Sequence, residues 1–157
     1  MYNTTQDLLD AFGATPHTIQ GLLRGHTHEQ AVIARGGDEN CSVVEVVCHL
    51  RDAEERGLER TRLMRDQTNP WLAGYDQAQL AKDRNYAATP LDDAVAAFLK
   101  LRTTHIAELA ALSSQEWERP GEHEEQGTIT IGNHILHLVS HDAIHLAQIA
   151  RQLEQIQ

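Results

Sequence analysis

Histidine is the residue type that stands out in this sequence. Ten of the 157 residues are histidine, and four of them lie close together near the C-terminus, at His134, His137, His141 and His145. If this stretch is helical, successive residues are about 100° apart, and all four imidazoles fall on one strip of the helix. Two histidines four residues apart can present two nitrogen ligands to one metal ion. The spacing therefore predicts a metal site on this strip.

One ion can take only one adjacent pair from the strip. Residues four apart are about 6 Å apart along the axis, which Zn–N bonds of about 2 Å can span, whereas His137 and His145 are about 12 Å apart. The pair is either His137 with His141 or His141 with His145, so a further ligand must come from another helix. His49 is the best candidate, because it lies at the edge of the apolar stripe of an earlier predicted helix. Three imidazoles leave coordination positions open, which is typical of catalytic sites.

The other titratable residues are not expected to bind the metal ion. Asp52 is one turn from His49 and is the candidate acid–base residue, able to orient an imidazole or take a proton. The alternative for Asp52, and the interpretation of Glu54, Glu55 and Asp142, is a solvated helix charge. The five remaining histidines are interpreted as solvated surface residues: His17, His26, His28, His105 and His123.

Helical periodicity dominates the chain, and stretches that alternate with period two are few and short. Apolar stripes predict four long helices, at about residues 4–24, 42–67, 89–112 and from about 130 to near the C-terminus. Ser42 and Glu45 form a capping box at the start of the second helix. The segment of residues 68–89 is too long for a tight hairpin and predicts a crossover between the second and third helices. The expected fold is an all-α four-helix bundle, a single domain over residues 1–157.

Composition excludes several classes of protein. Hydrophobic residues make up 41% and charged residues 23%, which is typical of a folded chain. The 23 acidic residues against 13 basic ones give a formal net charge of −10, which disfavours binding to nucleic acid or to an anionic membrane surface. No apolar run reaches the roughly 18 residues of a membrane span, and the first residues lack the regions of a secretory signal, so a cytoplasmic location is expected. The spacing of Cys41 and Cys48 does not support a disulfide.

Two stretches of the chain resemble the DinB-like (DinB/YfiT) family. The second helix of that family is similar to residues 42–60, SVVEVVCHLRDAEERGLER, and its last-helix signature is similar to residues 137–149, HLVSHDAIHLAQI. Three further segments follow the expected order, namely ATP in the first helix, NPWL, and LSSQEWERPG leading into TIT. The resemblance therefore covers nearly the whole chain.

The resemblance implies a metal centre in a four-helix bundle that is often arranged up-down-down-up. It selects His141 and His145 as the pair, because Leu146 and Gln148-Ile149 fix the register, and it makes His49 the third ligand. The cofactor is then a divalent metal ion, and three neutral imidazoles fit Zn²⁺, Ni²⁺, Co²⁺ or Fe²⁺. Family members often dimerise, so a homodimer is expected.

The function implied by the resemblance is less uniform. Some relatives transfer a low-molecular-weight thiol such as bacillithiol, mycothiol or glutathione, which makes a metal-dependent thiol S-transferase the first hypothesis. The second is a metal-dependent hydrolase with Asp52 or Glu54 as base, and the third is a non-catalytic metal-binding stress-response module. His134 and His137 are additional to the histidines of the family pattern. They are interpreted as packing residues or as residues that contact the metal ligands without binding the metal. Four arginines are candidates for binding the carboxylates of a thiol, although each also fits a plain surface position: Arg51, Arg56, Arg102 and Arg151.

Overall fold

Four long helices form where the apolar stripes predict them. The computed structural model describes residues 4–157, and the long helices are α1 (Thr4–Leu23), α3 (Val43–Asp66), α5 (Leu91–Ala110) and α6 (Ile131–Glu154). The shorter helices are α2 (His28–Ile33), α4 (Gln77–Asp83) and the 3₁₀ turns η1 (Tyr86–Ala88) and η2 (Glu116–Glu118). The strands are β1 (Arg35–Gly36), β2 (Cys41–Ser42), β3 (Trp71–Leu72), β4 (Pro120–His123) and β5 (Gly127–Thr130). None of the helices in residues 4–157 is both long and apolar enough to cross a membrane.

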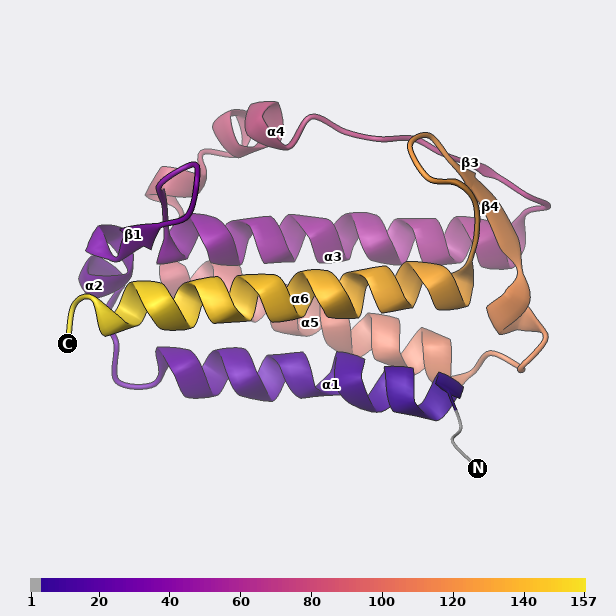
Figure 1. Cartoon of the computed structure of the whole chain (residues 1–157), viewed down its shortest axis with the longest axis horizontal. Helices are drawn as coiled ribbons and strands as arrows, with labels where there is room; N and C mark the ends of the chain where they lie inside the picture. Colours follow the sequence, from indigo (N-terminus) through magenta and orange to yellow (C-terminus); the bar gives the residue numbers. More distant parts are fainter. Residues whose placement is uncertain (1–3) are drawn as a thin grey trace.

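The four long helices lie side by side in a bundle (Figure 1). α1 and α6 run in one direction, and α3 and α5 run in the other. Because α3 and α5 are parallel and follow one another in the chain, the chain must return along the bundle between them. Residues 68–89 make this return, and we call them the crossing segment. The all-α four-helix bundle expected from the sequence is confirmed.

Side-chain caps set the starts of the two helices that carry the predicted ligands. The Ser42 hydroxyl accepts a hydrogen bond from the Glu45 N–H at the start of α3 (3.1 Å). The Glu45 carboxylate binds the Ser42 hydroxyl and Arg35 instead of reaching back to the Ser42 N–H, so the predicted capping box is half formed. Thr130 and Asn133 form a complete capping box at the start of α6. Each cap satisfies N–H groups that the helix leaves free.

A small sheet lies beside the bundle and was not expected from the sequence. β3 pairs in parallel with β4, and β4 pairs antiparallel with β5. The strands are two to four residues long, which is too short to give a period-two pattern. The sheet joins the crossing segment to the chain that leads into α6.

The core of the bundle consists of two apolar clusters with buried polar side chains between them. One cluster includes the C-terminal half of α1 and the N-terminal parts of α3 and α5, with Ile19, Val47, Phe98 and Ile149 among its members. The other lies toward the opposite end, with Phe12, Met64, Leu109 and Ile135 among its members. The polar layer between them is built around an arginine.

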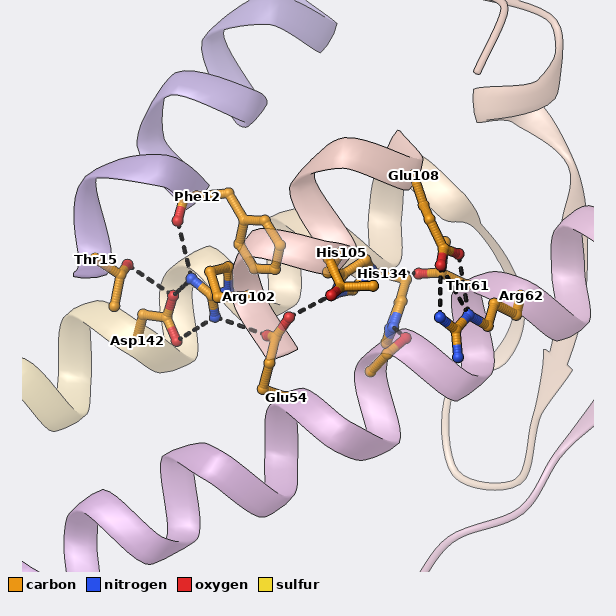
Figure 2. A network of polar contacts seen from close by, with 12 residues as sticks. Phe12, Thr15, Glu54, Thr61, Arg62, Arg102, His105, Glu108, His134 and Asp142 are labelled. Carbon is orange, nitrogen blue, oxygen red and sulfur yellow. Dashed lines mark hydrogen bonds and ion pairs between the residues drawn. The ribbon is translucent and has the colours of Figure 1, made fainter. Parts of the chain in front are cut away.

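Arg102 occupies the middle of this polar layer and is 1% exposed (Figure 2). From α5, its guanidinium donates to the Phe12 carbonyl oxygen on α1 (2.9 Å) and to the Asp142 carboxylate on α6 (2.7 Å). It also forms an ion pair with Glu54 on α3 (2.8 Å). One side chain therefore binds all four long helices. The interpretation of Glu54 and Asp142 as solvated charges is wrong, because their partners lie on other helices.

His105 extends the layer from α5 toward α3. Its Nδ1 lies 2.7 Å from the Glu54 carboxylate and its Nε2 lies 2.8 Å from the Thr61 hydroxyl. Burial would raise the pKa of Glu54, but the His105 hydrogen bond and the Arg102 charge lower it overall. The interpretation of His105 and His123 as solvated surface residues is also wrong, since both are buried.

Replacing Arg102 with leucine tests how much the buried polar layer contributes to the stability of the fold. The change leaves the carboxylates of Glu54 and Asp142 without their cation, so we expect the free energy of unfolding to fall by about 3–5 kcal/mol. Urea denaturation of the metal-free protein measures this loss. The control is Glu108→Gln, which weakens partly exposed ion pairs with Arg62 and Arg65 and should cost about 1 kcal/mol or less. Equal losses of unfolding free energy in the two variants would show that the buried layer contributes no more than a surface ion pair.

His134 links α6 to α3 next to this layer. Its buried Nε2–H donates to the Gly57 carbonyl oxygen (3.0 Å). Burial lowers the pKa of His134 from its ordinary value of 6.5 to about 3. The ring is therefore neutral in the folded protein over most of the acidic range.

Acidification should destabilise the fold through His134. The unfolded chain binds a proton at this ring below about pH 6.5, whereas the folded chain does so only near pH 3, so stability is lost as the pH falls through that window. A His134→Gln side chain can still donate to Gly57 but does not titrate. We expect it to reduce the pH slope of the unfolding free energy by about 1.4 kcal/mol per pH unit between about pH 6 and 4. Urea unfolding at several pH values gives this slope, and an unchanged slope would rule the contribution out.

Candidate metal centre

Three imidazoles from two helices converge on one point between α3 and α6. His49 comes from α3, and His141 and His145 come from successive turns of α6. One ring nitrogen of each lies within 4.8 Å of those of the other two, and Nε2 of His49 lies 2.8 Å from Nε2 of His141. Two nitrogens bound tetrahedrally to one ion are about 3.3 Å apart, so a small adjustment brings this pair to ligand geometry. The structure thus brings the three predicted ligands together.

The environment of the rings leaves their nitrogen lone pairs available. Burial, followed by the charge of neighbouring imidazoles, lowers the pKa of His49 to about 4 and that of His141 to about 3. Both rings are therefore neutral near pH 7, as a metal ligand must be. Nδ1 of His141 is buried and has no hydrogen-bond partner within the described part of the chain. The donor set of three neutral imidazoles fits a divalent transition metal.

Gln148 orients the ring of His145, one of the three predicted ligands. Its Oε1 lies 2.8 Å from Nδ1 of His145, and because an amide oxygen only accepts, that nitrogen carries the hydrogen. The hydrogen bond leaves Nε2 of His145 free for a metal ion. Gln148 also donates to the Gly36 carbonyl oxygen (3.4 Å), which anchors it to β1. From the sequence, Gln148 is expected only to fix the register, although its spacing of three from His145 indicates a contact on one helix face.

Cavities lie on both sides of the histidine cluster. The larger one is about 590 Å³ and is lined by all three histidines, Gln148 and residues of the crossing segment. The smaller one is about 300 Å³ and lies toward the C-terminal end of α3. His141 and Gln77 line both cavities, so the cluster lies at their junction beneath the crossing segment. The volumes suit a small-molecule ligand.

Asp52 is not a solvated charge, and it is not brought into this arrangement either. It is 2% exposed, and its carboxylate accepts hydrogen bonds from the Tyr86 hydroxyl, from Arg51 (2.8 Å) and from Arg84 (2.7 Å). Burial would raise its pKa, but the Arg51 and Tyr86 hydrogen bonds lower it overall. Asp52 lines neither cavity beside the histidines, and it connects α3 to the crossing segment instead.

His137 lies next to the cluster but outside it. Its ring is stacked 6.4 Å from that of His141, and the exposed side chain lines the smaller cavity. Among the arginines considered for substrate carboxylates, Arg102 is buried in the core, whereas Arg56 lines the smaller cavity and Arg151 the larger. Arg51 is bound to Asp52.

Comparisons with known proteins agree with this architecture. A protein of Oceanobacillus iheyensis, named as a candidate metal-dependent hydrolase, is 30% identical over 108 residues, which is 69% of this chain but only 62% of that protein. The solved structure of YfiT from Bacillus subtilis has a TM-score of 0.88 at 20% identity and covers 99% of this chain and 90% of its own. Its description names a candidate metal-dependent hydrolase with an unusual four-helix bundle topology. The sequence pattern of the DinB superfamily matches residues 11–149, and the chain belongs to that superfamily.

Proposed function

We propose that the protein is a metal-dependent enzyme that hydrolyses a small-molecule substrate. The observation that carries the proposal is the convergence of His49, His141 and His145 at the junction of two cavities. Three protein ligands leave coordination positions for a reactant, and the cavities offer room beside them. The two relatives described as candidate metal-dependent hydrolases support the same reaction class.

The roles of the chain's own residues follow from the geometry. A divalent ion held by the three imidazoles supplies a Lewis acid, which polarises a substrate carbonyl and lowers the pKa of water or of a thiol. Gln148 keeps His145 in the tautomer that presents Nε2. The crossing segment covers the site and limits the entry of bulk water.

Neither predicted base faces the cavities. Glu54 is held by Arg102 and His105 in the core, and the oxygens of Asp52 accept bonds from three donors. We infer that Asp52 positions the crossing segment over α3. A catalytic role for Asp52 stays a prediction without support from these contacts.

Thiol transfer is the second candidate function, and it stays a prediction. A metal ion held by three imidazoles could equally bind a thiol and favour its thiolate form, and arginines lie in both cavities to receive its carboxylates. Zn²⁺, Ni²⁺, Co²⁺ and Fe²⁺ all remain candidates for the ion, since imidazole suits each. A homodimer and a cytoplasmic location also stay predictions.

Metal analysis tests the ligand set. We expect about one divalent ion per chain, and we expect His49→Ala, His141→Ala and His145→Ala each to lose most of it, because two imidazoles alone hold a metal far more weakly. Elemental analysis after dialysis against limiting Zn²⁺ measures the content. His137→Ala is the matched control, since it removes an imidazole of α6 outside the cluster and should keep full loading. Full metal content in the His145→Ala protein would show that the ligand assignment is wrong.

Activity assays separate the candidate reactions. We expect hydrolysis of small esters or amides that falls to background when a chelator removes the metal and returns when the metal is restored. A thiol requirement, with conjugation of an electrophile as the only metal-dependent reaction, would replace the hydrolase proposal with thiol transfer. Metal loss that lowers the melting temperature, with no activity in either assay, would instead indicate a non-catalytic metal-binding module.

A further inference from the structure

The smaller cavity beside the histidine cluster is lined by basic side chains. Arg56 and Arg60 come from α3, His137 comes from α6, and His123 comes from the end of β4. Glu125 is the one acidic residue in its lining. A cavity of this composition attracts an anionic group.

The larger cavity has the opposite character. Three acidic residues, Asp38, Glu39 and Glu45, line it, against a single arginine, Arg151. Because the histidine cluster lies at the junction, a substrate held there meets acidic side chains on one side and basic side chains on the other. An anionic end of the substrate is therefore directed into the smaller cavity.

Arg60 is the residue whose hydrogen bonding is incomplete. It donates to the Ala73 carbonyl oxygen of the crossing segment (2.6 Å), but its Nε is buried and has no hydrogen-bond partner within residues 4–157. No carboxylate in that range lies within ion-pair distance of it. A buried guanidinium N–H without an acceptor is costly, and a carboxylate oxygen is its best acceptor.

The groove between α3 and α6 connects Arg60 to the histidine cluster. His49, Ala53, Gly57 and Arg60 follow one face of α3, and the backbone positions of His49 and Arg60 are about 16 Å apart along the axis. Gly57 packs closely against α6, since a Cβ there would lie 2.7 Å from the Leu138 side chain and would require that side chain to shift. The Arg60 side chain lines the same cavity as His141, so both ends of this span face one space. The span fits a small molecule of several carbon atoms.

We infer that the smaller cavity is a carboxylate-binding subsite, in which Arg60 and Arg56 hold a carboxylate of the substrate whose reacting end lies at the histidine cluster. The inference rests on the proposed function and names its substrate class, a small carboxylic acid derivative. Arg56 is already paired with Glu59 (3.0 Å), and the charge of Glu125 balances that of Arg60. The subsite therefore depends on the unused hydrogen-bond donor of Arg60, and it suits a monoanion better than a phosphate dianion.

A length series of diacids tests the subsite in the Zn²⁺-loaded protein. Calorimetry compares each α,ω-dicarboxylate from succinate to sebacate with the monocarboxylate of the same chain length. We expect one length at which the second carboxylate improves affinity by at least about tenfold, as a hydrogen bond between charged groups does. Arg60→Gln should remove this advantage while leaving monocarboxylate affinity and metal content unchanged. Arg56→Gln should weaken the advantage, which provides a second variant should Arg60→Gln loosen the crossing segment.

The controls separate the subsite from the proposed function. Arg62→Gln removes an arginine of α3 that pairs with Glu108 outside the cavity, and it should keep the full diacid advantage. If Zn²⁺ binds but no diacid gains over its monoacid, or if Arg60→Gln keeps the gain, the subsite is overturned and the metal proposal stands. If Zn²⁺ does not bind, the metal proposal fails. The subsite is then tested with pentanoate and the metal-free protein, and binding that is lost in Arg60→Gln still supports it. Pentanoate binding that Arg60→Gln leaves intact overturns the subsite.

Discussion

The architecture depends on one buried guanidinium. Arg102 binds the Phe12 carbonyl oxygen, Glu54 and Asp142, so it fixes α1, α3 and α6 against its own helix. Glu54 is five residues beyond His49, and Asp142 is the neighbour of His141 in the chain. The ion pairs that fix the register of α3 and α6 therefore also bring their histidines face to face. A slip of one turn between α3 and α6 would shift His49 by about 5 Å relative to His141 and His145, and the three rings would no longer converge.

α3 organises the site because each of its faces contacts a different part of the molecule. Glu54 faces the core, His49 faces the groove toward α6, and Asp52 faces the crossing segment through Tyr86 and Arg84. The segment that covers the groove is thus fixed by the same helix that carries His49. Within residues 4–157, the buried Nδ1 of His141 and the buried Nε of Arg60 have no hydrogen-bond partner, which is unfavourable. Both features favour a folded protein that holds a ligand.

Much of the site could be predicted because its determinants are local. The spacing of His141 and His145 along one helix, and the position of His49 at the edge of another stripe, are visible in the sequence. The buried roles of Glu54 and Arg102 could not be predicted, because a charged residue reveals its burial only through partners on other helices. The short strands could not be predicted for a related reason, since their pairing is set by the crossing segment and not by a pattern within each strand.

The central claim is that His49, His141 and His145 hold a single ion between α3 and α6. A crystal structure of the metal-loaded protein, with anomalous diffraction recorded at the absorption edge of the metal, tests it most directly. We expect one anomalous peak at about 2.0–2.1 Å from a nitrogen of each of the three rings. A peak bound elsewhere, or one coordinated by the two α6 histidines with His49 turned away, would contradict it.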